Sequence, residues 1–280
     1  MKLTTKIVLG IIISIFLLSF CVIIGISFID TDKYESRLSG YRPTISQENI
    51  IAVDVELYQT IKVDQVQIQE ERSVYLSGTI RLIPVINQED KNKLLLPEEL
   101  LRFTDITSSS DTLIIRLNTS ALYEQYMTNK DKEENTYSTN TIDGINFFAH
   151  TNNIDVICNV SGIKTDVRNI ITDKININTN GEIEIDSCQA NLVEPYIKSN
   201  SRRFLLKNSQ VKELNIDLDQ IGTSWKIENC DIEVENLTGS GNRRISFPKI
   251  ETKIMNWIPK DKDAQLTVTL YGDTASIVFP

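Results

Sequence analysis

The sequence predicts an all-β protein in which a parallel β-helix, or β-solenoid, follows one N-terminal transmembrane helix. Three observations lead to this prediction. An uncharged run of 23 residues lies near the N-terminus, short strand patterns without a helical period fill the chain from residue 142 onward, and a 21-residue repeat starts at Ile183. A β-sandwich is the main alternative, because it also consists of many short strands.

The uncharged run IVLGIIISIFLLSFCVIIGISFI covers residues 7–29. At ~1.5 Å per residue, a helix of this length crosses a hydrocarbon core of about 30 Å. Lys6 before the run and Asp30 and Asp32 after it favour a cytoplasmic N-terminus. The predicted division is a short cytoplasmic tail, a signal-anchor helix, a linker and an extracytoplasmic β-helix domain, at residues 1–6, 7–29, 30–44 and 45–280.

Two alternatives remain open for the N-terminus. Gly25-Ile26-Ser27 fits the small-x-small pattern of a cleaved signal peptide, and LLSFC ending at Cys21 suggests a lipoprotein signal. The run is longer than the apolar region of most signal peptides, and Phe20 is bulky where a lipoprotein signal has a small residue. These two features favour the uncleaved anchor.

The charge balance excludes one class of partner. The chain has 29 basic and 38 acidic residues and a net charge of −9. Two of the basic residues, Lys2 and Lys6, precede the apolar run, so the remainder is more acidic still. An acidic exported domain argues against nucleic-acid binding and against docking on anionic lipid.

The region before residue 142 is predicted to hold strands with one helical interruption. We expect two or three strands in residues 45–69, a strand pair around Ser77-Gly78 in residues 74–86, and a strand at residues 111–117. Pro97, followed by two glutamates, predicts one or two helical turns within residues 94–103. Residues 123–140 are polar and aperiodic, which is typical of an exposed loop.

The repeat aligns three segments: IEIDSCQANLVEP from Ile183, FLLKNSQVKELNI from Phe204 and WKIENCDIEVENL from Trp225. Their starts are evenly spaced, and their apolar positions coincide. A 21-residue period built from short strands suits a solenoid coil that advances by one strand spacing, ~4.8 Å. A shorter, 18-residue coil is predicted from Phe247, and the final strand or hairpin is predicted to cap the open end.

The repeat also predicts a polar corner between strands. Ser187, Asn208 and Asn229 align with one another, and Asn tolerates left-handed backbone angles. Stacked Asn side chains can also hydrogen-bond along the solenoid axis. Cys188 and Cys230 follow this corner two coils apart, beyond disulfide reach, so we expect interior free thiols and no disulfide.

The sequence resembles the auto-transporter adhesin "head GIN" domain proteins of bacterial envelopes over roughly residues 45–240. The resemblance rests on an entry strand at residues 51–57 (IAVDVEL), a second strand at residues 112–117 (TLIIRL), a Leu-rich segment before it, and coils from about Ile154. It implies a right-handed parallel β-helix in the bacterial envelope. The family has no established catalytic residues, so the resemblance carries none over.

The sequence offers few residues for catalysis or metal binding. His150 is the only histidine and is expected to be structural, which argues against a His-cluster metal site and against a Ser-His nucleophile. Phosphate-binding and zinc motifs are also absent from the sequence, and no cofactor is expected. Carboxylates remain, at Asp217/Asp219 and at Glu182/Glu184/Asp186, and such pairs can cleave a glycosidic bond.

Two arginine pairs form a candidate ligand-binding site. Arg202-Arg203 and Arg243-Arg244 are separated by close to two periods of the repeat. In a solenoid they would lie on one edge and suit an anionic sugar or a carboxylate. Trp225, which is aligned with core positions, is expected in the core.

These observations favour a single-pass envelope protein with a non-catalytic β-solenoid that has a structural, adhesive or ligand-binding role. The expected partners are the membrane, through residues 7–29, and an anionic glycan or another envelope protein. The alternatives are a carbohydrate-active enzyme on the same scaffold and a partner of a membrane signalling protein. Only weak small-xxx-small spacing in the apolar run supports the signalling alternative.

Overall fold

The computed structural model describes residues 49–66, 73–126, 137–198, 202–221, 225–247 and 251–270. All of them belong to one compact unit, Pro43–Pro280. The predicted tail, transmembrane helix and linker lie outside the described residues, as do Cys21 and the end of the chain after residue 270. Within the described part, none of the helices has the length and apolar character needed to cross a membrane.

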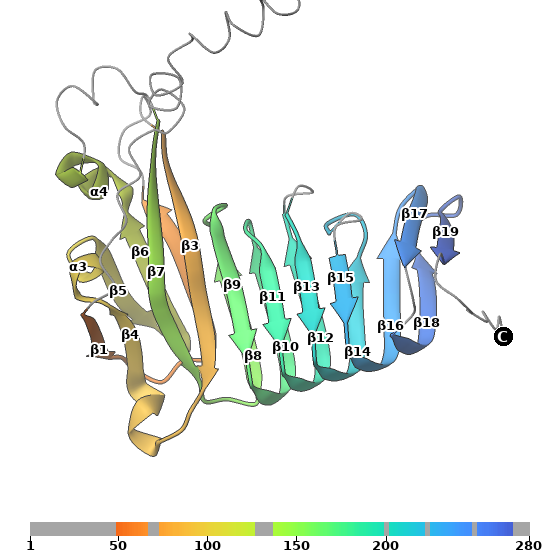
Figure 1. Ribbon diagram of the computed structural model, residues 1–280, viewed down its shortest axis with the longest axis horizontal. Coiled ribbons are helices and arrows are strands. Elements are labelled where there is room, and N and C mark those ends of the chain that lie inside the picture. The colour runs from red at the N-terminus through yellow and green to blue at the C-terminus, as the bar shows by residue number, and fades with distance from the viewer. Residues whose placement is uncertain are drawn as a thin grey trace, which may run out of the picture. The chain divides into compact units, whose positions relative to one another are not determined.

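The described residues form an all-β structure with two large, mostly parallel sheets (Figure 1). The nine-stranded sheet has the order β18-β16-β14-β12-β10-β8-β2-β6-β5. Its strands are β18 Thr252–Pro259, β16 Asp231–Gly239, β14 Gln210–Asp217, β12 Gln189–Ile197, β10 Ile171–Thr179, β8 Asn153–Cys158, β2 Thr60–Val66, β6 Thr112–Asn118 and β5 Thr104–Ser109.

The eight-stranded sheet has the order β1-β4-β7-β3-β9-β11-β13-β15. Its strands are β1 Ile50–Asp54, β4 Lys93–Pro97, β7 Tyr137–Ala149, β3 Ser73–Pro84, β9 Ile163–Arg168, β11 Ile183–Asp186, β13 Phe204–Lys207 and β15 Trp225–Glu228. A small parallel sheet joins β17 Asn242–Phe247 to β19 Gln265–Leu270. The helical pieces are η1 Gln88–Asn92, α3 Glu98–Leu101 and α4 Thr119–Tyr126.

The predicted repeat is confirmed by the strand register. Ile183 pairs with Phe204, and Phe204 pairs with Trp225, both in parallel and at the spacing of the aligned segments. In the other sheet, Gln189 pairs with Gln210 at the same offset. Mostly parallel pairing of this kind differs from the antiparallel sheets of a sandwich.

The offset between paired strands is not constant along the chain. Asp173 and Asn191, which hydrogen-bond between β10 and β12, are 18 residues apart, and Thr165 pairs with Ile183 at the same short offset. Between β16 and β18 the offset is 20, as for Asn236 and Asn256. Phe247 itself pairs with Leu270, an offset of 23, so the predicted 18-residue coil from Phe247 is wrong in length, and the short offset lies upstream. The apolar pattern of the sequence identifies the strands but not the length of the turns that join them. A shorter turn leaves the same residues of each strand facing the core.

The N-terminal strands join the same two sheets out of chain order. β2 lies between β6 and β8. β3 lies between β7 and β9 (Figure 1). β3 is one long strand and not the predicted pair, with a register shift after Gly78. Gly78 has φ of +137°, and a Cβ there would lie 1.6 Å from the carbonyl oxygen of Ile142, so only glycine fits this bulge.

The chain passes from β7 to β8 through residues 150–152 and so skips the coil formed by β2 and β3. Tyr58 is buried at this crossing and donates its hydroxyl proton to the Phe148 carbonyl at 3.0 Å. Its ring contacts the ring of His150 edge to face, with centroids 4.6 Å apart. The histidine therefore packs at the crossing, as expected for a structural residue.

The predicted polar corner is confirmed. Asn208 and Asn229 have φ of 48° and 55°, and Ser187, at the equivalent position, has φ of 57°. The side-chain amide of Asn229 donates to Asn208 Oδ1 at 3.4 Å, and that of Asn208 donates to Asp186 Oδ1 at 2.9 Å. Asn thus provides both the left-handed turn and a hydrogen-bonded stack along the axis.

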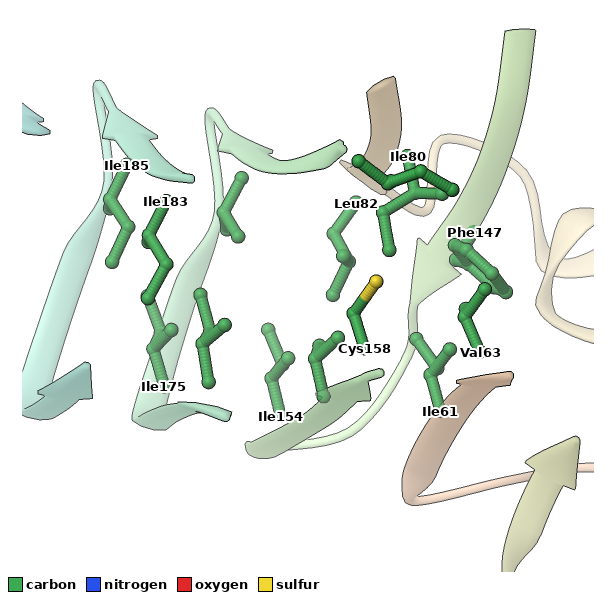
Figure 2. Close-up of a cluster of buried hydrophobic side chains, with 14 of the residues drawn as sticks. Ile61, Val63, Ile80, Leu82, Phe147, Ile154, Cys158, Ile175, Ile183 and Ile185 are labelled. Atoms are coloured by element: carbon green, nitrogen blue, oxygen red, sulfur yellow. The ribbon is translucent and has the colours of Figure 1, made fainter. Parts of the chain in front are cut away.

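Apolar side chains from both sheets meet between them and form continuous columns (Figure 2). One column from the nine-stranded sheet contains Ile154, Ile175, Val193 and Leu214. One from the eight-stranded sheet contains Ile183, Phe204 and Trp225. Trp225 is 9% exposed and belongs to the core, which confirms its predicted place.

The thiols of Cys158, Cys188 and Cys230 are free, and the first two are buried. Ser209 occupies the coil between Cys188 and Cys230, and its Oγ accepts the backbone N–H of Cys188 at 3.1 Å. Burial raises the pKa of the Cys158 and Cys188 thiols to about 11. Both therefore stay protonated and unreactive at neutral pH.

One carboxyl group interrupts the apolar columns. Glu235 in β16 is 2% exposed and lies in register between Leu214 and Met255. Its Oε1 is buried without a hydrogen-bond partner among the described residues. Desolvation raises the pKa of Glu235 to about 7, because the ionised form is disfavoured inside the core.

The left-handed corner leads to a first prediction. Asn208→Ala should lower the free energy of unfolding by about 1 kcal/mol more than Asn208→Gly, because a Cβ opposes this backbone angle. Denaturant unfolding measures the difference. At Asn236, which lies within β16, the alanine substitution should instead lower the free energy of unfolding less than the glycine substitution, because glycine weakens a strand. The same order at both positions would contradict the assigned backbone angle.

The second prediction concerns Glu235. Its folded-state pKa exceeds the ordinary value of 4.5, so stability should fall as pH rises from about 4.5 to 7. Glu235→Gln should match the wild type near pH 4 and be about 2–3 kcal/mol more stable at pH 8. Denaturant unfolding at both pH values measures this. A difference independent of pH would mean that the carboxyl does not titrate inside the core.

Candidate functional site

The arginines of the predicted site lie on different elements of the structure. Arg203 directly precedes β13, and Arg243 and Arg244 lie in β17, which pairs with β19 and not with β15. Arg203 lies 3.9 Å from Glu182, and Arg243 pairs with Asp219 and donates to the Ser240 carbonyl at 3.0 Å. The strand pairing therefore does not place the two pairs in one row, and a shared cationic edge that includes Arg202 stays a prediction.

The acid pair Asp217/Asp219 is bound by cations. Lys260 Nζ lies 2.6 Å from Asp217 Oδ1 and 3.1 Å from Asp219 Oδ2, and Arg243 contacts Asp219 as well. Burial opposes ionisation of Asp219, but hydrogen bonds from Ser240, Lys260 and Arg243 outweigh it and lower its pKa. This carboxyl holds no proton at neutral pH and so cannot serve as the general acid of a glycosidase.

The second acid group belongs to an ion-pair network on the outer face of the eight-stranded sheet. Glu184 receives Lys164 at 3.0 Å and Lys207 at 2.8 Å. Despite the opposing effect of burial, these two hydrogen bonds lower the pKa of Glu184 to about 2. The pKa of Asp186 is lowered mainly by the hydrogen bond from Asn208. Glu184 is thus an ionised partner of two lysines, and Asp186 is a hydrogen-bond acceptor at the polar corner.

The strongest candidate for a functional surface is the outward face of the nine-stranded sheet, hereafter the ladder face. Every second residue of its strands points away from the core, and one row across six neighbouring strands is made of amides and carboxylates. This amide row consists of Asp155, Asn176, Glu194, Asn215, Asn236 and Asn256.

Hydrogen bonds join the members of the amide row. Asn256 donates to Asn236 at 2.9 Å, Asn236 to Asn215 at 2.9 Å, and Asn215 to Glu194 at 3.2 Å. A shorter run joins Asn176 to Asp155 at 2.7 Å. Each amide therefore has a fixed orientation, and its donor N–H points toward the preceding strand.

Each run of the amide row ends at a carboxylate, which can only accept hydrogen bonds. Glu194 ends the longer run and also receives Lys174 Nζ at 2.6 Å. The pKa of Glu194 is lowered chiefly by this hydrogen bond and further by that of Asn215. The ionised carboxylate orients the run, since an amide N–H is its favourable neighbour.

A groove of about 470 Å³ lies beside the amide row. One side is formed by members of the row, and the other by Tyr196, Asp217, Thr238 and Ile258 from four neighbouring strands. Ile258 is 49% exposed although it is apolar. The groove thus combines hydrogen-bonding groups with an aromatic ring and an aliphatic side chain, as ligand sites commonly do.

A second groove of about 400 Å³ follows the bend at the start of the same strands. Gln189 and Gln210 line it and hydrogen-bond to each other at 3.2 Å, and Asn191 donates to Asp173 at 2.7 Å. It continues the pattern of side-chain ladders along the sheet. Among the residues that the structure describes, no group of three His, Cys, Asp or Glu residues is placed to hold a metal ion.

The comparisons with known proteins leave the family open. No family model matches the chain, and no curated protein matches it significantly. The resemblance to GIN domain proteins therefore stays a prediction.

Solved structures with weak likeness include a "putative adhesin" from Bacteroides fragilis, at 12% identity and a TM-score of 0.39, covering 82% of this chain and 97% of that one. A "putative adhesin" from Parabacteroides merdae has 9% identity and a TM-score of 0.30, covering 81% and 99%. A "putative lipid binding protein" from Parabacteroides distasonis has 11% identity and a TM-score of 0.33, covering 83% and 98%. Likeness at this level carries no weight for the function of this chain.

The amide row itself leads to a third prediction. Asn215→Asp places a second carboxylate beside Glu194, so stability at pH 7 should fall by about 1 kcal/mol and recover at low pH as the acids protonate. Denaturant unfolding at pH 7 and pH 4 tests this. Asn92→Asp, at the exposed end of η1, adds the same charge away from the row and serves as the control. Equal effects of the two substitutions on stability would show that the side chains of the amide row do not interact with one another.

Proposed function

We propose that this chain is a membrane-anchored, non-catalytic β-solenoid protein of a bacterial cell envelope, and that it binds an extended polar polymer on its ladder face. The observation that carries the proposal is the amide row with its adjoining groove. A surface that repeats once per coil suits a ligand that also repeats along its length.

The strand pairing supports a solenoid for the region from β8 to β16. Each strand of the nine-stranded sheet is followed by one of the eight-stranded sheet, and the chain then returns to pair in parallel with the preceding coil. In this region the paired strands of successive coils are offset by 18 or 21 residues, as for Ile171 with Gln189 and Gln189 with Gln210. Connections between parallel strands of one sheet are right-handed in nearly all proteins, which favours a right-handed winding.

The composition supports the envelope location. The uncharged run at residues 7–29 is long enough to anchor the chain, and the acidic charge of the remainder suits an exported domain. In this arrangement the ladder face lies outside the cytoplasm. A helix at residues 7–29 that inserts into a bilayer is part of the proposal.

The ion pairs support a non-catalytic role. Four of the carboxylates singled out from the sequence contact lysine or arginine side chains, namely Glu182, Glu184, Asp217 and Asp219. The fifth, Asp186, accepts hydrogen bonds from Asn208 and Ser187, and the pKa values that are shifted in this set are shifted downward. Glycoside cleavage by two carboxyls needs one that keeps its proton. Glu235 has a raised pKa, but it faces the core and not a groove.

The fourth prediction tests the proposed function with the purified full chain. It should be retained on at least one immobilised polysaccharide from a panel of neutral, amino-bearing and carboxylate-bearing polymers. A double variant, Asn176→Leu with Asn236→Leu, should lose most of this retention, because it removes hydrogen-bonding groups from the groove. The polymer should keep its length on incubation.

A variant with Arg202→Ala and Arg244→Ala serves two purposes in the same assay. It leaves the groove intact, so its retention should match the wild type. Loss of retention on a carboxylate-bearing polymer in this variant alone would transfer the binding site to the arginine pairs. No retention on any polymer would refute the proposed function, and shortening of a polymer would refute its non-catalytic part.

A further inference from the structure

The groove beside the amide row has a direction. Its walls come from five neighbouring strands, β10, β12, β14, β16 and β18, so the groove crosses the strands and follows the direction in which the coils stack. Five strands at ~4.8 Å spacing extend it to roughly 20 Å. An elongated ligand in this groove therefore lies parallel to the solenoid axis.

We propose that the occupant is a neutral or amino-bearing glycan chain, bound along the axis with about one sugar unit for each coil. This inference rests on the proposed function and specifies its ligand. Each sugar of an extended β-1,4-linked glycan advances the chain by about 5 Å, which is close to the ~4.8 Å spacing of the strands. The amide row therefore offers one polar side chain to each successive sugar ring.

The charge of the groove selects against an anionic chain. Three carboxylates line it, those of Glu194, Glu213 and Asp217, and no lysine or arginine does so among the described residues. Lys174 and Lys260 contact two of these acids but are not part of the lining. Carboxylates of an acidic polysaccharide would lie beside carboxylates of the groove, which is unfavourable, whereas hydroxyl and ammonium groups would donate to them.

The amide row has free hydrogen-bonding capacity for such a chain. A primary amide has two N–H donors, and Asn176 and Asn215, which line the groove, each use one of them in the row. Sugar hydroxyls both donate and accept, so each can pair with an amide or carboxylate without leaving a buried group unsatisfied. The orientation of the row also distinguishes the two ends of the chain, because all its donors point toward the preceding strand.

Tyr196 supplies the apolar contact that a sugar ring needs. It lines the groove from β12, beside the acidic and amide groups, and is half-buried. An aromatic ring offers its face to the C–H groups of a sugar, while its hydroxyl stays near water. Ile258 supplies a second apolar contact from β18, which β14 and β16 separate from β12 in the sheet.

The fifth prediction tests this with β-1,4-linked N-acetylglucosamine oligomers and their deacetylated, amino-bearing counterparts. Calorimetric Kd values of the full chain should fall as the oligomer lengthens from two to about five units and then level off, because the groove spans about five coils. Galacturonate oligomers of equal length should bind at least tenfold more weakly. Tyr196→Ala should raise Kd about tenfold, and Tyr75→Ala, on the eight-stranded sheet, should leave it unchanged.

The outcomes separate this inference from the proposed function. If a polysaccharide is retained by the full chain but oligomer affinity does not depend on length, or galacturonate binds best, the axial neutral glycan is wrong and a polymer-binding role stands. If Tyr196→Ala and Tyr75→Ala have equal effects, the groove is not the site. If no polymer is retained, both proposals fail. Unchanged thermal unfolding of the variants establishes that they are folded.

Discussion

The structure depends on one constraint, the parallel pairing of strands in register from one repeat to the next. Because Ile183, Phe204 and Trp225 are held side by side by backbone hydrogen bonds, whatever suits one coil must suit its neighbours. Apolar residues consequently stack into columns, left-handed residues stack at the corner, and amides stack on the outer face. The core, the turns and the candidate site thus all follow from a single geometric rule.

The same rule makes each exception visible. Ser187 adopts a left-handed angle that Asn occupies in the next two coils, and Glu235 places a carboxyl in a column of aliphatic side chains. A globular core surrounds such a residue with unrelated neighbours. Here the equivalent residues on the adjacent strands show which residue type the position favours. The free-energy cost of a residue such as Glu235 can therefore be judged by comparing it with those neighbours.

The repeat could be predicted from the sequence because its signal lies in neighbouring segments of equal length. The even spacing, the Asn corner and the core place of Trp225 all follow from aligning three segments. The insertion of β2 and β3 beside β8 and β9 could not be predicted, because Gly78 pairs with the distant Ile163 and no repeat relates their segments. No local pattern indicates that Arg243 and Arg244 lie in β17, which pairs with β19 in a separate small sheet.

Residues of the ladder face lie in the same aligned segments. They did not indicate a binding site, because alternating polar residues on a strand usually mark a solvated surface. Its distinguishing property is physical order. A hydrogen-bonded amide has already lost its rotamer freedom on folding, whereas an isolated surface asparagine loses it on binding. The row from Asn256 to Glu194 thus presents fixed donors and acceptors at regular intervals, and a ligand with the same repeat forms each contact at a reduced entropic cost. Preorganisation of this kind allows a shallow groove to bind a long polymer without a deep pocket, because many modest contacts act together.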